Sequence, residues 1–67
     1  MSDKLDEIDK KILKFIEKSD WPVTTEQVAG GAGVSWNTAQ IHLYKIQVMK
    51  KIKGKRVGRQ NQWMRTN

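Results

Sequence analysis

Hydrophobic residues recur near the start of the chain with the period of an α-helix. The apolar positions in this segment are Leu5, Ile8, Ile12, Phe15 and Ile16. Wound at 3.6 residues per turn, they fall within roughly 100° of arc, as expected for a helix that packs one face on a core. Acidic residues are concentrated in its first turns and basic residues lie near its end, the order that the helix dipole favours. We predict a first helix over residues 3–18, capped by Ser2 or Asp3, with most of its acidic side chains on a solvated face.

Signals for a second helix follow directly. Pro22 cannot continue the first helix, and Val23 is expected to form a short strand-like step. Thr24 and Gln27 have the spacing of a capping box, in which each side chain bonds the backbone N–H of the other residue. The second helix is therefore predicted over residues 25–30.

Glycines then mark a tight connection to a third helix. They are Gly30, Gly31 and Gly33. We expect them to end the second helix because glycine accepts positive φ without steric cost. Ser35 supplies the next N-cap, and a third helix is predicted over residues 36–49 with Leu43 and Ile46 on its buried side.

The last part of the chain alternates in the manner of a β-hairpin over residues 51–66. Ile52 and Trp63 are its strongest apolar anchors, and residues 58–61 form the expected turn between its strands. The alternation places these residues on one face: Ile52, Gly54, Arg56, Asn61, Trp63 and Arg65. The lysines of the first strand then point outward. The predicted fold is mainly α with a small β-hairpin, a single domain of residues 1–67 in the order helix, strand, helix, helix, strand, strand.

Charge is divided unevenly along the chain. All seven acidic residues lie at or before Glu26, whereas the 33 residues from Ser35 onward carry eight lysines or arginines and no acid. This division predicts a polyanionic partner for the C-terminal half. The chain has no cysteine and no apolar run longer than three residues. These absences exclude a disulfide framework, a thiolate metal site and a membrane span, and they predict a cytoplasmic protein.

The segment from Val28 to Ala39, followed by Leu43 and Ile46, resembles the helix-turn-helix of winged-helix DNA-binding proteins, and the basic hairpin resembles their wing. The likeness is most specific at Ala29, Gly33, Val34, Ser35 and Leu43. It implies a three-helix winged helix-turn-helix whose third helix enters the major groove. Lys50 stands where the family usually has glycine. Since a left-handed lysine costs on the order of 1 kcal/mol, we expect the third helix to end differently here.

The resemblance implies two sets of contacts with double-stranded DNA. The residues expected to face base edges are Trp36, Asn37, Gln40, Ile41 and Tyr44. The residues expected at the backbone or in the minor groove are Thr25, Ser35, Lys45, Lys51, Lys53, Lys55, Arg56 and Arg59. Amide side chains suit the adenine edge, isoleucine suits the thymine methyl group, and lysine suits phosphates as a flexible point charge. The expected function is that of a small, sequence-specific transcriptional regulator associated with the nucleoid.

Other interpretations stay open. Tyr44 and Trp63 resemble the aromatic pair of winged helices that bind Z-form nucleic acid, although Gln40 stands at that family's asparagine and the wing prolines are missing. The exposed side of the third helix, together with Leu13, could instead bind a protein. The hairpin lysines could simply protect a strand edge from pairing. A homodimer is expected to use the first helix or the wing, because the chain ends at Asn67 without a further helix.

Catalysis, metals and cofactors are not expected. The chain has one histidine, His42, which falls on the inward side of the third helix with no second metal ligand at hand, so a packed or hydrogen-bonded role is predicted. The glycines of residues 30–33 lack the following Lys-Ser/Thr pair and the preceding strand of a phosphate-binding loop. No nucleophile and base are recognisable together, so we predict no enzyme activity.

Overall fold

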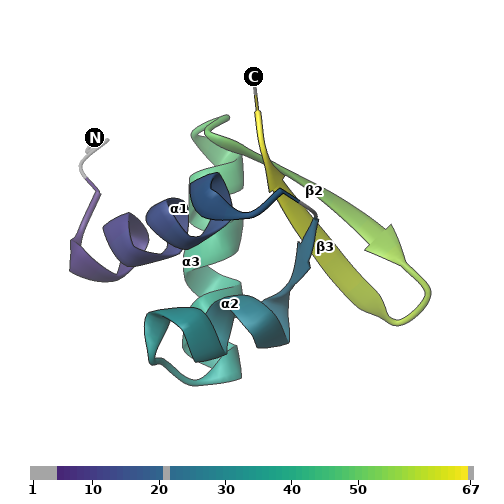
Figure 1. Cartoon of the computed structure of the whole chain (residues 1–67), viewed down its shortest axis with the longest axis horizontal. Helices are drawn as coiled ribbons and strands as arrows, with labels where there is room; N and C mark the ends of the chain where they lie inside the picture. The colour runs from purple at the N-terminus through teal and green to yellow at the C-terminus, as the bar shows by residue number, and fades with distance from the viewer. Residues whose placement is uncertain (1–4, 21, 67) are drawn as a thin grey trace.

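A computed structural model describes residues 5–20 and 22–66, and within these ranges three helices and three strands follow one another along the chain (Figure 1). The elements are α1 (Glu7–Lys18), β1 (Val23–Thr24), α2 (Thr25–Ala32), α3 (Trp36–Val48), β2 (Ile52–Val57) and β3 (Gln60–Arg65). Their order confirms the predicted three-helix winged helix-turn-helix fold, mainly α with a small β-hairpin.

Helix α1 begins at Glu7, later than the predicted start at residue 3. Asp6 is its N-cap: the Asp6 carboxylate accepts a hydrogen bond from the Asp9 N–H (2.9 Å), and the Asp9 carboxylate accepts one from the Asp6 N–H (3.1 Å). This reciprocal pair satisfies two backbone donors that a helix start otherwise leaves unpaired. Ser2 and Asp3, the residues expected to cap the helix, lie outside the described residues.

Helix α2 begins at the predicted capping box and runs two residues beyond its predicted end. Gly30 and Gly31 are helical, so the expectation that all three glycines end the helix was wrong. Gly33 alone makes the turn: it has φ +71°, and its N–H donates to the Ala29 carbonyl. Gly31 serves packing instead, because a Cβ at this position would clash with the ring of Phe15 on α1.

Helix α3 ends at Val48 through a left-handed residue. Lys50 has φ +63°, its N–H donates to the Gln47 carbonyl (2.8 Å), and the Lys51 N–H donates to the Ile46 carbonyl (3.2 Å). These two bonds are those of a Schellman cap, which usually has glycine at the left-handed position. The expectation that lysine would change the helix end was therefore wrong, and the chain retains an unfavourable residue there.

The three strands form one antiparallel sheet in the order β1-β3-β2. Trp63 on β3 lies between Val23 of β1 and Gly54 of β2, and its buried ring occupies the space that a Cβ at Gly54 would need. The registers Ile52↔Arg65, Gly54↔Trp63 and Arg56↔Asn61 confirm the predicted alternation. The turn is shorter than expected: the strands are joined by Gly58 (φ +64°) and Arg59, and residues 60 and 61 belong to β3.

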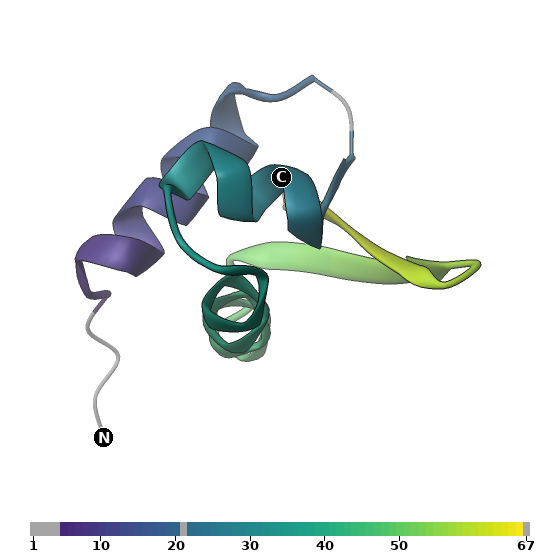
Figure 2. The ribbon, with the colours of Figure 1, turned by 90° about the horizontal axis from the view of Figure 1, so that it is seen from below.

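The core gathers one face from every element. Its members are Ile12, Ile16, Val23, Val28, Ala29, Ala32, Ala39, Leu43, Ile46, Ile52 and Trp63. Figure 2 looks nearly along the axis of α3. In this view α1 and α2 lie above α3, and the β2–β3 hairpin extends sideways from the helices. One side of α3 thus has no helix against it in the described part of the chain. Nowhere in that part is a helix both long and apolar enough to cross a membrane.

Candidate nucleic-acid interface

The uncovered side of α3 carries large exposed side chains next to a fully buried side. Ala39, Leu43 and Ile46 face the core, whereas Ile41 is 62% exposed and the predicted base-contacting residues Trp36, Asn37 and Tyr44 are also exposed. Ser35 caps this helix: its hydroxyl accepts from the Thr38 N–H (3.2 Å) and donates to the Thr38 hydroxyl (3.0 Å). The Ser35 side chain, expected at the DNA backbone, is exposed but already bonded within its own helix.

A chain of hydrogen bonds runs from the core to this surface. The Trp63 indole N–H donates to the Thr25 hydroxyl (2.9 Å), which donates to Oε1 of Gln40 (2.9 Å). Nε2 of Gln40 then donates to the Tyr44 hydroxyl (3.0 Å), and Nδ2 of Asn61 donates to the same oxygen (3.3 Å). The indole can only donate, and from Trp63 the bonds run in one direction through Thr25 and Gln40 to the Tyr44 hydroxyl. With both acceptor positions of its oxygen used, the Tyr44 hydroxyl has its hydrogen left to donate outward.

This chain of bonds changes the roles of two predicted contact residues. Thr25 is 3% exposed, and its hydroxyl is engaged by Trp63 and Gln40, so its side chain does not reach a DNA backbone as expected. Gln40 is held at both ends of its amide, by Thr25 and by Tyr44, and could make a bidentate contact with adenine only by breaking these bonds. Gln40 therefore positions Tyr44 in this structure.

Tyr44 is also held by its ring. The Tyr44 and Trp63 rings meet edge to face, with centroids 5.6 Å apart and planes at 81°. Such pairs contribute about 0.5–1.5 kcal/mol beyond the area they bury. Trp63 is only 1% exposed. It therefore supports Tyr44 from within the core and is not itself a surface residue.

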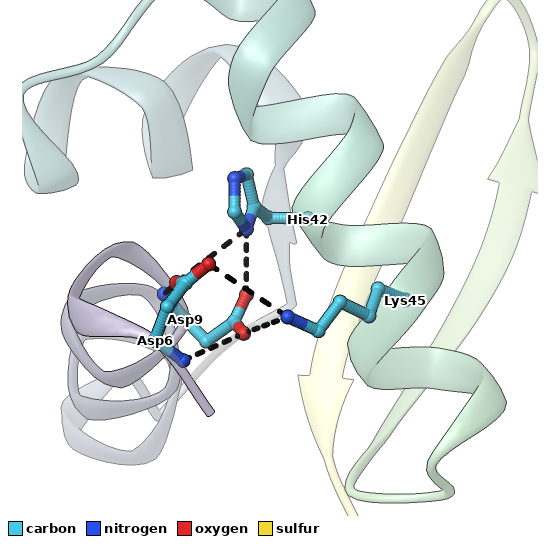
Figure 3. Close-up of polar contacts among 4 residues, drawn as sticks. All are labelled: Asp6, Asp9, His42 and Lys45. Carbon is cyan, nitrogen blue, oxygen red and sulfur yellow. Dashed lines mark hydrogen bonds and ion pairs between the residues drawn. The ribbon is translucent and has the colours of Figure 1, made fainter. Parts of the chain in front are cut away.

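On the other side of α3, two of its residues bind acidic side chains at the start of α1 (Figure 3). The Lys45 ammonium lies 2.5 Å from Oδ2 of Asp9 and 3.7 Å from Oδ2 of Asp6. Nδ1 of His42 lies 2.7 Å from Oδ1 of Asp9, so this nitrogen carries a hydrogen and donates it to the carboxylate. Asp9 is completely buried.

The contacts of Asp9 keep it ionised. Burial alone would raise the pKa of its carboxyl, but the hydrogen bonds from Lys45, from His42 and from the Asp6 backbone outweigh burial and lower the pKa below its ordinary value of 3.8. The hydrogen bond to Asp9 in turn raises the pKa of Lys45 above 10.5. Lys45 was expected at the DNA backbone, and here its charge is committed to α1.

Most acids of α1 were expected on a solvated face, and Asp6, Glu7 and Glu17 are exposed, but Asp9 is buried and is the exception. A signal was present in the sequence, because Asp9 lies four residues after Leu5 and three before Ile12, on the apolar stripe. His42 is hydrogen-bonded, as predicted. Asp6, Asp9 and His42 are close enough to hold a metal ion, with ligand atoms within 4.8 Å of one another. The Lys45 ammonium already lies against both carboxylates, so the cluster is explained as an ion-pair network.

The wing carries the largest uncompensated charge. The predicted backbone contacts Lys51, Lys53, Lys55, Arg56 and Arg59 are all exposed. Among the residues that the structure describes, none of them lies within ion-pair distance of a carboxylate. Arg56 makes one weak internal bond, from Nε to the Gly58 carbonyl (3.4 Å). These five cations are therefore available to an anionic partner.

A notch of about 330 Å³ lies between α3 and the wing. Its lining residues are Thr24, Thr25, Glu26, Trp36, Gln40, Tyr44, Arg56, Arg59, Gln60 and Asn61. The notch brings Trp36, Gln40 and Tyr44 of α3 next to Arg56 and Arg59 at the wing tip, so part of each predicted contact set meets there. Glu26 belongs to this surface, although sequence reasoning gave it no role.

Comparison with known proteins bears on the fold alone. No protein-family model matches the chain, and no curated protein is significantly similar to it in sequence. A solved structure of human N-acetylserotonin methyltransferase in complex with SAM is similar, with a TM-score of 0.73 at 14% sequence identity. The match covers 100% of this chain and 26% of that chain, so this chain spans about a quarter of the methyltransferase. The same arrangement of helices and strands thus occurs within a larger protein.

Proposed function

We propose that this protein binds duplex DNA in a sequence-specific manner, as a small transcriptional regulator. The observation that carries the proposal is that Trp36 and Tyr44 of α3 line the same notch as Arg56 and Arg59 of the wing, with three further exposed lysines along the hairpin. A helix with exposed amide, apolar and aromatic side chains suits readout in the major groove, and exposed cations that form no ion pair among the described residues suit phosphates.

The residues divide into two groups under this proposal. Asn37 would read an adenine edge and Ile41 would contact a thymine methyl group, with Trp36 and Tyr44 beside them on α3. Tyr44 has a hydroxyl hydrogen free to donate to a phosphate or base acceptor. The wing lysines would contact phosphates, and Arg59 at the wing tip would enter a minor groove. Lys45 and Thr25 are left out, because their polar groups are engaged inside the protein.

The test is selection of bound duplexes from a random pool, followed by fluorescence anisotropy at several salt concentrations. With about five phosphate contacts, log affinity should fall against log salt with a slope near −4.5. Asn37→Ala should weaken the selected duplex more than a random one, whereas Lys53→Ala should weaken both alike. Lys10→Ala, which removes an exposed lysine of α1, is the matched control and should change little. A flat salt response, or equal effects of Lys53→Ala and Lys10→Ala, would contradict the proposal.

A second candidate is recognition of left-handed nucleic acid. It is favoured by the edge-to-face pair of Tyr44 and Trp63 and by the bonds that fix the Tyr44 hydroxyl, since such an aromatic pair is the feature that resembles Z-form-binding winged helices. Circular dichroism of an alternating GC duplex decides it: inversion of the spectrum on adding protein supports this candidate, and an unchanged right-handed spectrum removes it. The protein-interaction alternative loses one residue, because Leu13 packs against the core.

A further inference from the structure

The notch between α3 and the wing contains aromatic and acidic residues that binding to a DNA groove or to phosphates does not require. One wall carries the half-exposed aromatic rings of Trp36 and Tyr44, and the wing side carries Arg56 and Arg59. Glu26, the second residue of α2, also lines this space and is the only acidic residue among its described lining residues. A site for phosphate alone would not gain from an acid or from aromatic rings.

The size and depth of the notch favour one unstacked nucleotide. Its volume of about 330 Å³ is at the lower end of the roughly 300–1,000 Å³ of small-ligand pockets. Paired and stacked bases offer only their edges to a protein, so they cannot fill a hollow of this kind. Unpaired bases do so readily by stacking on aromatic side chains, at about 1–3 kcal/mol per base. Trp36 is the larger exposed ring of the notch and is free of the hydrogen bonds that fix Tyr44.

Glu26 sets which base fits. Its side chain is exposed, and among the described residues no lysine or arginine lies within 4.0 Å of its carboxylate. An ionised carboxylate only accepts hydrogen bonds, and its two oxygens can accept two parallel donors. On the Watson–Crick edge, guanine alone offers two adjacent donors, N1–H and the N2 amino group. Adenine, cytosine and thymine each place an acceptor beside their donor, and that acceptor would be repelled.

We propose that the notch binds one unpaired guanine nucleotide of a bound nucleic acid. The base stacks on Trp36, its N1–H and N2–H donate to Glu26, and its phosphate lies on Arg56 and Arg59. This inference rests on the proposed nucleic-acid function and adds a position at which the protein reads a base outside the duplex. It requires the bound DNA to contain a bulge, a flipped base or a single-stranded end.

The test is an NMR titration of the ¹⁵N-labelled protein with dGMP, dAMP, dCMP and dTMP, with deoxyribose 5-phosphate as the probe without a base. The Trp36 indole N–H and the side-chain amides of Gln60 and Asn61 report on the notch. We expect dGMP to bind about tenfold more tightly than dTMP, the effect of one additional hydrogen bond to a charged acceptor. Glu26→Gln should abolish this preference. Glu17→Gln makes the same charge change on α1, away from the notch, and should retain it.

Other outcomes would overturn the inference. Equal shifts with all four nucleotides and with the base-free probe would show that the notch takes phosphate only, equal shifts with the four nucleotides alone would show a base site without selectivity, and a preference that survives Glu26→Gln would remove Glu26 as the reader. A paired duplex titrated into the same sample separates the two proposals. If the duplex binds while dGMP and a duplex with one bulged guanine show no preference, the notch inference fails and the proposed function stands. If neither duplex binds, the proposed function fails as well.

Discussion

Replacing Asp9 by Asn should destabilise the protein by about 2–3 kcal/mol. The carboxylate is fully buried and accepts from Lys45 (2.5 Å), His42 (2.7 Å) and the Asp6 backbone (3.1 Å). Hydrogen bonds to charged groups contribute about 1.5–3 kcal/mol each, and breaking a fully buried ion pair costs about 3–5 kcal/mol. We expect the loss of stability to fall below the roughly 3–5 kcal/mol of a fully buried ion pair, because the Lys45 side chain is 39% exposed and its ammonium can return to water.

Thermal unfolding followed by circular dichroism measures this loss. For a domain of this size, 2–3 kcal/mol corresponds to a fall in Tm of roughly 10–20 °C. Glu7→Gln is the matched control, because it neutralises an exposed acid in the same helical turn and should change Tm only slightly. If Asp9→Asn and Glu7→Gln had the same small effect, the ion-pair network would not be the link between α1 and α3 that its geometry indicates.

The same variant should alter the acid limb of the stability curve. Because the pKa of Asp9 is lowered in the folded protein, its contribution is present above the unfolded value of 3.8 and is lost as the pH falls below it. Lys45 keeps its charge throughout this range, since its pKa is raised above 10.5. Chemical denaturation should therefore show a difference between wild type and Asp9→Asn that is constant near neutrality and shrinks below about pH 4. A difference independent of pH would contradict the assignment.

Two further predictions concern Lys50, where glycine would be favoured, and Gly54, where glycine is required. Both are measured by the same denaturation assay. Lys50→Gly should stabilise the protein by about 1 kcal/mol because it relieves the left-handed cap at φ +63°, whereas Lys51→Gly should not stabilise it. Gly54→Ala should destabilise it by about 1–3 kcal/mol, since the new Cβ would lie 2.5 Å from the Trp63 ring. Gly30→Ala, in an open helical position, should instead stabilise it by up to about 1 kcal/mol. The opposite result at Lys50 or at Gly54 would refute the local geometry.

The fold was predictable from the sequence because its signals are local. The period of Ile12 and Ile16, the capping box at Thr24 and the alternation around Ile52 and Trp63 each depend on residues close together in the chain. Helix ends were predicted less well. At Lys50 the two capping hydrogen bonds form despite the cost of a left-handed lysine, a balance that propensity alone cannot decide.

The candidate site was predictable only in outline. The exposed side of α3 and the wing cations follow from periodicity and charge, but the bond partners join residues far apart in the chain. Thr25, Gln40 and Trp63 form one hydrogen-bonded chain over 38 positions, and Asp9 meets Lys45 across the same core. No rule of spacing selects such partners. Thr25, Gln40 and Lys45, whose side chains are bonded within the protein, were therefore predicted to be DNA contacts.

The central claim is that α3 and the wing form one nucleic-acid surface. An NMR titration of the ¹⁵N-labelled protein with a selected duplex tests it most directly. We expect the largest shifts at Trp36, Asn37 and Tyr44 on α3 and at Lys53 and Arg59 on the wing, with α1 little affected. Shifts confined to α1, or no shifts at low salt, would contradict it.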